Sequence, residues 1–396
     1  MSTLKVDGIR SNSASSDAIT LASDGTCTAN ITNNLSNRNL IINGAMQVAQ
    51  RGTSGTTTSS GYLACDRMRI SVGGVDEAVT MAQSALTSSD TPYTKGFRYA
   101  TKITNGNQTS GAGATDKVNF MYRLEGLDVN GSGWDYTSAS SFVTISFWVK
   151  SSVAQTFYLR FRMTGSSVTK EYVTAINATT SWQKITKTIP GGTGVDSVNT
   201  TAEGAFVQFV LFRGTGETGS MTIDQWNTYN SSAKVPDMTS TWYTTNDATF
   251  EITGLQMEVG SVATDFEHRS FGQELALCQR YFYKTYDYAT APGTATFVGA
   301  QHGRNFDPGA ARSSVPIYLN FPVRMRTVPT LTWYAGDGQS GKYSTGSTVG
   351  GSNLTTEKSV GTSIDKSETG IYHANFTEDV PAANLYAYHV LAEAEL

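Results

Sequence analysis

The sequence is short of charge and of long apolar runs, and each shortage excludes a class of protein. Asp, Glu, Lys and Arg make up 16% of the 396 residues, and the formal net charge is −4, whereas about a quarter is usual. Binding to phosphates needs clustered Lys and Arg, so we expect no nucleic-acid partner. No apolar run approaches the roughly 18–20 residues that span a bilayer, so we expect no membrane insertion. The opening MSTLKVDGIRSNSASS lacks the apolar core of a signal peptide, which predicts assembly in a cytoplasm.

Signals for chemistry are also missing. The sequence has no G-x-S-x-G, H-E-x-x-H or paired C-x-x-C, and its four histidines are scattered without metal-ligand spacing. GDGQSGK at residues 336–342 matches most of a P-loop, but Tyr343 follows it and we expect no helix there to hold a phosphate. Cys27, Cys65 and Cys278 are odd in number and far apart, which argues against a disulfide framework. We therefore predict no catalytic residue, no metal, no cofactor and no enzymatic activity.

The sequence is instead rich in short alternating segments. VTISFWVK (143–150) and FYLRFRMT (157–164) place an apolar residue at every second position. Similar segments recur up to residue 270, bounded by Gly, Asn, Thr or Pro. Many short strands without intervening helices predict an all-β fold, either an antiparallel sandwich or a barrel. These residues alone do not separate a jelly roll from an immunoglobulin-like sandwich. Trp134 and Trp148 lie in or beside such strands, so we expect both to be buried.

The spacing of the apolar residues changes within residues 250–284. Apolar residues alternate over 252–259, as in a strand with one buried face. Gly254 interrupts the alternation, which indicates a bulge or a close backbone approach.

A short helix is expected next. Phe271, Leu275, Cys278 and Phe282 are three or four residues apart, which predicts one apolar helix face. Ser270 and Gln273 have the spacing of a capping box. We interpret the helix as a clasp between two β domains.

The same stretch carries a family resemblance. ITGLQMEVGSVATDFEHRSFGQELALCQRYFYK (252–284) resembles a segment that recurs in tail-fibre and tail-associated structural proteins of bacteriophages. Further segments fit the same resemblance: NLIINGAMQVAQRG (39–52), Asp66-Arg67, VTISFWVKSS (143–152), FPVRMRTVPTLTW (321–333) and AEAEL (392–396). The resemblance implies a virion component built on a carbohydrate-binding-like jelly roll.

Asp66 and Arg67 are neighbours in sequence, which predicts that they point to opposite sides of a strand and do not pair with each other. We expect Asp66 to tether a loop and Arg67 to stack on an aromatic ring, rather than to bind a ligand.

We predict four parts of the chain. Residues 1–35 have too little apolar surface for a core and form a docking or oligomerisation segment. A jelly-roll-like antiparallel β-sandwich (36–270), the helical clasp (271–284) and a second, smaller β-sandwich domain (285–396) follow. Three prolines, Pro316, Pro322 and Pro329, confine the strands of the last part to edges and bends.

The predicted function is that of a phage virion structural protein, tail-fibre-like, that contributes to adsorption to a host cell-surface glycan. We expect a homotrimer that contacts other tail or capsid proteins through its N-terminal segment and is located in the virion after assembly in the host cytoplasm. Two alternatives remain open. One is a purely structural virion component, such as a decoration, collar or tail protein. The other is a non-catalytic carbohydrate-binding module.

Two stretches are candidates for glycan recognition. Residues 225–247 are loop-like and contain aromatic rings among Asn and Asp, the chemistry that stacks on sugar rings and bonds their hydroxyls. The candidate binding residues there are Trp226, Tyr229, Trp242 and Tyr243. The alternative is that these rings pack the rim of the sandwich or a subunit interface. The second candidate is the Gly-Ser-Thr-rich stretch 336–363, expected to be a loop or hairpin tip.

Overall fold

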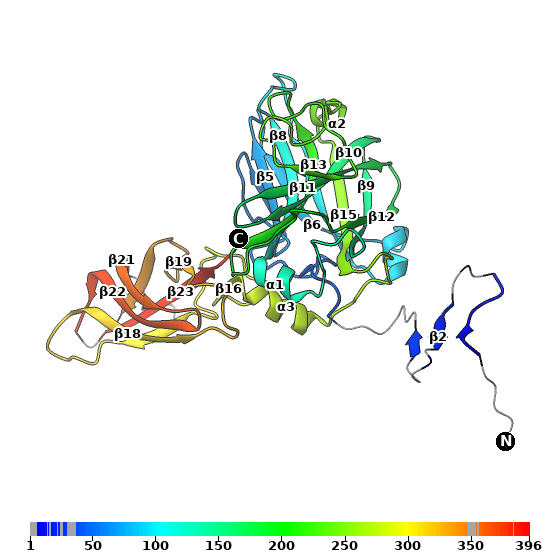
Figure 1. Cartoon of the computed structure of the whole chain (residues 1–396). Coiled ribbons are helices and arrows are strands. Elements are labelled where there is room, and N and C mark those ends of the chain that lie inside the picture. Colours follow the sequence, from blue (N-terminus) through cyan, green and yellow to red (C-terminus); the bar gives the residue numbers. More distant parts are fainter. Residues whose placement is uncertain are drawn as a thin grey trace.

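The computed structural model describes residues 6–13, 15, 17–21, 23, 27–29, 37–346, 354, 356–382 and 384–396. The protein is mostly β-strand, which confirms the all-β prediction (Figure 1). The described part contains three short α-helices: α1 (Gly126–Gly131), α2 (Thr241–Thr244) and α3 (Phe271–Gln279).

Two six-stranded antiparallel sheets pack face to face as a sandwich. The first sheet has the order β12-β9-β15-β7-β6-β4 and the second has the order β14-β11-β10-β13-β8-β5. Their bounds are β4 (Ser54–Thr57), β5 (Met68–Gly73), β6 (Val79–Ala85), β7 (Tyr99–Thr104), β8 (Lys117–Glu125), β9 (Phe142–Ser151), β10 (Gln155–Thr164), β11 (Thr169–Ala178), β12 (Gln183–Pro190), β13 (Glu203–Arg213), β14 (Trp226–Thr228) and β15 (Thr249–Val259).

The predicted alternation of apolar and polar residues correctly identifies the side chains that form the core. In β9 the apolar residues Val143, Ile145, Phe147 and Val149 are fully buried between the sheets. Phe147 meets Phe209 of the opposite sheet edge to face, with 4.8 Å between ring centroids, a favourable aromatic geometry.

Strand β15 confirms the bulge but not the single buried face. Its pairing with β9 shifts register between Thr253 and Gln256, and Gly254 has a left-handed φ of 62°. A Cβ at Gly254 would lie 2.6 Å from Cζ of Phe97, so the bulge also needs glycine for space. The polar residues Thr253, Gln256 and Glu258 are buried as well, and Val259 is exposed.

The two sheets differ in their outer faces. Residues 214–239, which we call the strap, include the edge strand β14, and the segments on either side of it pack on the outer face of the second sheet. Val235 of the strap packs on Val173 and Val210, and all three are fully buried. The strap therefore covers part of this face, and among the described residues no such segment covers the hollow on the outer face of the first sheet.

The remaining strands form an eight-stranded antiparallel network with its own core, here called the distal sheet. Its bounds are β16 (Phe282–Lys284), β17 (Gln301–Arg304), β18 (Arg312–Asn320), β19 (Thr330–Tyr334), β20 (Lys342–Gly346), β21 (Thr356–Lys366), β22 (Gly370–Val380) and β23 (Leu385–Glu393). β23 is central: β16 and β19 both pair with residues 391–393, so they lie on opposite edges of it. Pro316 lies in β18, at the end of the strand order, as expected for a strand with proline.

Part of the stretch 336–363 is strand rather than loop, because β20 and β21 pair antiparallel within it. Residues 347–353 and 355, between these strands, lie outside the described residues.

Near the N-terminus, β1 (Gly8–Ile9), β2 (Ile19–Leu21) and β3 (Cys27–Ala29) form a small antiparallel sheet. The docking role of residues 1–35 and the boundaries at residues 35, 270 and 284 stay predictions.

Candidate functional site

Residues from distant parts of the chain meet between the sandwich and the distal sheet, at what we call the junction. Arg67 is fully buried, forms an ion pair with Glu395 and lies 3.4 Å over the ring of Tyr281. Both oxygens of Asp66 accept hydrogen bonds from Gln50, one from its backbone N–H at 2.8 Å. The predicted roles of a loop tether and a stacked guanidinium are therefore confirmed.

The predicted strand position of this pair is wrong. Asp66 and Arg67 lie in a turn before β5, and Arg67 has a left-handed φ of 68°.

Further charged side chains of the junction also have ion-pair or hydrogen-bond partners. Arg280 donates two hydrogen bonds of 2.9 Å to the fully buried Glu125, which also accepts one from the Tyr281 hydroxyl. Arg51 pairs with Glu393 at 2.8 Å, and Arg326 donates to the backbone oxygen of Ala394 at 2.6 Å. Because these charges pair across the junction, they hold the two β structures together.

Helix α3 begins as predicted, but within the helix its buried face agrees with the predicted one only at Cys278. Ser270 and Gln273 form the capping box. The buried residues of the helix are Glu274 and Cys278, whereas Phe271 is exposed. Glu274 is accommodated because it accepts the backbone N–H of Asn43. Burial raises the pKa of the Glu274 carboxyl, partly opposed by this hydrogen bond and by Arg269.

The cysteines whose side chains are described, Cys65 and Cys278, are free and buried. Burial raises the pKa of the Cys65 thiol to about 12 and that of Cys278 well above its usual value. Both thiols therefore stay protonated, as expected of small core residues.

Two of the four candidate glycan residues are core residues, which corrects the sequence interpretation. Trp242 and Tyr243 in α2 are fully buried. Trp242 donates its indole N–H to the Thr249 carbonyl at 3.1 Å, and Tyr243 stacks on Phe212 with 4.2 Å between ring centroids. Neither ring has a free face for a sugar, because the helix turns both into the end of the sandwich.

The other two candidates belong to the strap. Trp226 is half-buried, contacts Phe161 and Tyr172, and donates its indole N–H to the Pro190 carbonyl at 2.7 Å. Tyr229 is exposed and lies beside the guanidinium groups of Arg160 and Arg162. The structure thus separates the four rings instead of gathering them. Sugar binding by Trp226 or Tyr229 stays a prediction.

The outer face of the first sheet carries a hollow of about 580 Å³, here called the sheet-face hollow. Its lining residues are Lys95, Phe97, Ser146, Trp148, Lys184, Gly254, Asp265, Phe266 and His268. Strand β9 positions Trp148 there, and Lys184 of β12 is its cross-strand neighbour. Trp148 is half-buried, not fully buried as expected from the sequence.

Three rings close one side of this hollow. Phe97, Phe266 and His268 contact one another, with centroid separations of 4.8 to 5.0 Å. Nε2 of His268 lies 3.1 Å from the Lys95 carbonyl, which fixes the ring. Aromatic walls with a few charged and hydroxyl groups are the usual lining of small-molecule sites.

Sequence reasoning missed Trp148, although the alternation contained the signal. Trp148 shares its strand face with Thr144, Ser146 and Lys150, opposite the core residues of β9. A tryptophan on the polar face of a strand is a candidate for surface recognition.

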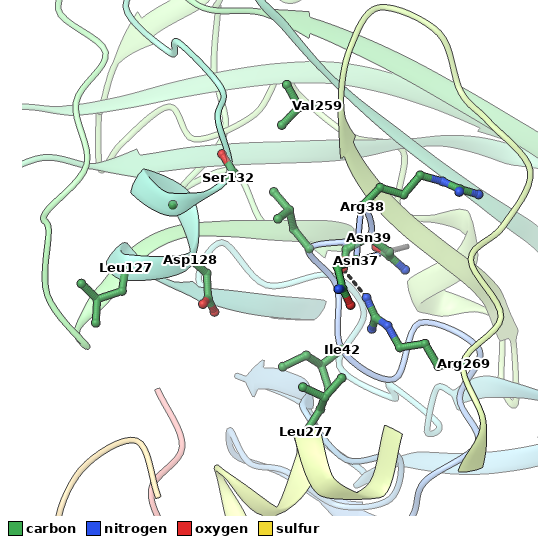
Figure 2. Close-up of a pocket in the computed structure, with 12 residues that line it drawn as sticks. Asn37, Arg38, Asn39, Ile42, Leu127, Asp128, Ser132, Val259, Arg269 and Leu277 are labelled. Carbon is green, nitrogen blue, oxygen red and sulfur yellow. Dashed lines mark hydrogen bonds between the residues drawn. The ribbon is translucent and has the colours of Figure 1, made fainter. Parts of the chain in front are cut away.

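A second hollow, of about 470 Å³, lies where residue 37 joins the sandwich, and we call it the entry hollow (Figure 2). Leu127 of α1, Leu277 of α3 and Val259 line it with exposed apolar side chains. Arg269 reaches across and donates to the Asn39 carbonyl at 2.6 Å. An exposed apolar rim therefore lies beside residue 37, just after the predicted N-terminal segment.

Among the described residues, no group of three or more His, Cys, Asp or Glu side chains could hold a metal ion. None of the helices in the described part of the chain has the length and hydrophobicity to cross a bilayer.

No family model and no curated protein matches the chain. Among solved structures, the enzymatically active domain of tailspike protein 4 of bacteriophage CBA120 is similar over 56% of this chain, with 11% identity and a TM-score of 0.30. The match spans only 21% of that tailspike chain. A putative sugar binding protein from Bacteroides thetaiotaomicron matches 56% of this chain and 100% of its own, with 12% identity and a TM-score of 0.30. A family 11 carbohydrate-binding module of a Clostridium thermocellum cellulase matches 55% of this chain and 98% of its own, with 11% identity and a TM-score of 0.25.

Proposed function

We propose that this protein is a tail-fibre-like structural component of a bacteriophage virion that contributes, without catalysis, to adsorption to a host cell-surface glycan. The sheet-face hollow is the observation that carries the glycan part of the proposal. It keeps a tryptophan accessible among Lys184, Asp265 and His268, on the sheet that the strap leaves open. Rings that stack on sugars and polar groups that bond hydroxyls are what such recognition needs.

The virion part of the proposal is supported by the position in the structure of the segments that resemble phage tail-associated proteins. Most of these segments contribute residues to the junction. They are Gln50 and Arg51 from 39–52, the Asp66-Arg67 pair, Arg280 and Tyr281 from 252–284, Arg326 from 321–333 and Glu395 from 392–396. Most of the segments that resemble tail-associated proteins thus share one structural task, which is to fix one β structure against the other, whereas 143–152 belongs to the core strand β9.

Adsorption through one such hollow would be weak. By analogy with stacking on bases, one ring on a sugar contributes about 1–3 kcal/mol. Several copies acting together would supply useful avidity. We propose a homotrimer, because residues 1–35 bury too little surface alone and a cyclic arrangement of copies would complete them. The same segment, with the entry hollow beside it, would contact the neighbouring virion protein.

The test is binding of the full-length oligomer to host cells and to their purified surface polysaccharide. We expect Trp148→Ala to reduce binding by at least tenfold without lowering the melting temperature. Tyr318→Ala removes a highly exposed ring of the distal sheet and is the matched control. If the full-length oligomer binds neither host cells nor their polysaccharide, the glycan part of the proposal is overturned.

The purely structural alternative is favoured by one observation, the number of paired buried charges at the junction, which serves assembly and no ligand. Electron microscopy of virions with this protein labelled distinguishes the alternatives. Label on tail fibres supports the proposal, and label on capsid or collar supports a decoration or collar protein. If the protein binds the saccharide but is not incorporated into virions, it is a carbohydrate-binding module.

A further inference from the structure

A third hollow, of about 450 Å³, lies at the edge of the first sheet, next to α3 and the loop after β16. We call it the edge hollow, and the side chains used below are Gln47, Gln83, Tyr99, Phe271, Lys284 and Tyr288. It shares no lining residue with the sheet-face hollow. Its volume is within the range of about 300–1,000 Å³ that is typical of small-molecule sites.

Three partly exposed rings line the edge hollow. Tyr99, Phe271 and Tyr288 keep 37%, 44% and 37% of their surface exposed. Phe271 and Tyr288 meet edge to face at 5.1 Å. The Tyr288 hydroxyl accepts the Ala49 N–H at 2.9 Å and lies 3.3 Å from the Gln47 carbonyl. Phe271 and Tyr288 are therefore held in place, and all three rings keep part of their surface accessible.

Lys284 supplies the charge of this hollow. Only 5% of the residue is exposed, and its ammonium donates to the carbonyls of Tyr288 and Thr290 at 2.8 and 2.7 Å. An ammonium has three donors, so one N–H remains without an acceptor among the described residues. No acidic side chain lines the edge hollow. A buried cation with a spare donor favours an anionic ligand group.

The amide side chains add neutral polar atoms. Nε2 of Gln83 donates to the Met46 carbonyl at 2.6 Å, which leaves its Oε1 to accept. The Gln47 side chain has no hydrogen-bond partner among the described residues. Both amides can therefore bond hydroxyl groups of a ligand.

We infer that the edge hollow binds an acidic saccharide residue. The carboxylate of the sugar pairs with Lys284, its C–H face lies against an exposed ring, and its hydroxyls bond the two glutamines. The rings select a sugar over a simple anion, and the lysine selects an acidic sugar over a neutral one. This site goes beyond the proposed function, because it is separate from the hollow that contains Trp148.

The test uses full-length protein and three acidic monosaccharides, glucuronate, galacturonate and N-acetylneuraminate, with glucose and galactose as neutral counterparts of the first two. Saturation-transfer NMR and titration calorimetry report binding. We expect at least one acid to bind about tenfold or more tightly than its neutral counterpart or, for N-acetylneuraminate, than either neutral sugar. Lys284→Met should weaken that binding about tenfold to a hundredfold, the value of a charged hydrogen bond.

Tyr99→Ala is the second variant, since it removes a ring without touching the lysine or its hydrogen bonds. It should also weaken binding, whereas Tyr318→Ala, a change far from the lysine on an exposed ring of the distal sheet, should bind the acidic sugar like the unaltered protein. The inference is overturned if none of the three acids binds. It is also overturned if the Lys284→Met and Tyr99→Ala variants both bind the acid as tightly as the unaltered protein. Equal competition by inorganic phosphate overturns it too, because that would show a simple anion site. Loss of host adsorption in Trp148→Ala tests the proposed function independently of these outcomes.

Discussion

Arg67 and Glu395 form a buried ion pair although 328 residues separate them in the sequence. Removing two charges from water is costly, and their attraction alone does not reliably offset the cost. Here further contacts stabilise the arginine, because Arg67 lies on the Tyr281 ring and donates to the Arg123 carbonyl at 2.8 Å. The pair therefore fixes the relation between the sandwich and the distal sheet.

Arg67→Met should destabilise the protein by about 3–5 kcal/mol, because it leaves the buried carboxylate of Glu395 with only the longer contact to Arg51, at 3.3 Å. Urea unfolding followed by circular dichroism measures the change. Replacing Glu395 by Leu in the same chain should recover part of the loss, since no buried charge then remains unpaired.

The exposed pair Arg312–Asp307 is the matched control, and Arg312→Met there should cost less than about 1 kcal/mol. Equal losses at the two arginines would contradict the special role of the buried pair.

Gly254→Ala should cost about 1–3 kcal/mol, because Gly254 has a left-handed φ and the new Cβ would meet Phe97. Since Phe97 also lines the sheet-face hollow, binding at that hollow should weaken as well. Thermal melting and saccharide titration report the two effects. Gly272→Ala is the control in α3, where nothing lies within 4 Å of the added Cβ, and it should be neutral or stabilising by up to about 1 kcal/mol.

Phe282→Ala should cost about 3–5 kcal/mol. Phe282 is fully buried, and the Arg51 guanidinium lies 3.8 Å over its ring. Leu275→Ala should cost less than about 2 kcal/mol, because Leu275 is only half-buried. Denaturant titration of the two variants tests this order. A larger loss at Leu275 would mean that α3 packs through the face first expected from the sequence.

Lys284 should make stability depend on pH above neutrality. Burial lowers the pKa of Lys284 to about 8, against the opposing effects of Asp66 and Asp287. Between about pH 8 and the unfolded pKa near 10.4, the unfolded chain keeps a proton that the folded chain has lost, so this residue makes stability rise with pH. Relative to Lys284→Met, the unaltered protein should gain about 1–3 kcal/mol between pH 7 and 10. A constant difference in unfolding free energy across this range would show that the lysine keeps an ordinary pKa.

Features governed by local patterns were predictable from the sequence. The alternation in β9 defines its core face, the Ser270–Gln273 spacing gives the capping box, and the glycine at 254 marks the bulge. Each depends on backbone geometry within a few residues, so no knowledge of distant contacts is needed.

Features that depend on distant contacts were not predictable. Trp242 and Tyr243 stand in a polar stretch, yet a single helical turn places them against Phe157 and Phe212. Phe271 fits the apolar helix period but faces Tyr288 of a later loop, in a hollow that exists only after the distal sheet has packed. The buried Glu274 depends on the N–H of Asn43, 231 residues earlier.

The position of β23 has a mechanical consequence. β16 and β17 pair with one edge of this strand, and β19 and β20 with the other, while Arg51, Arg67 and Arg326 hold the residues that continue from it. A force that pulls the distal sheet along β23 would load these hydrogen bonds in shear and together, rather than one after another. The rate of unfolding under tension, more than the equilibrium stability, then decides how long the two β structures remain attached.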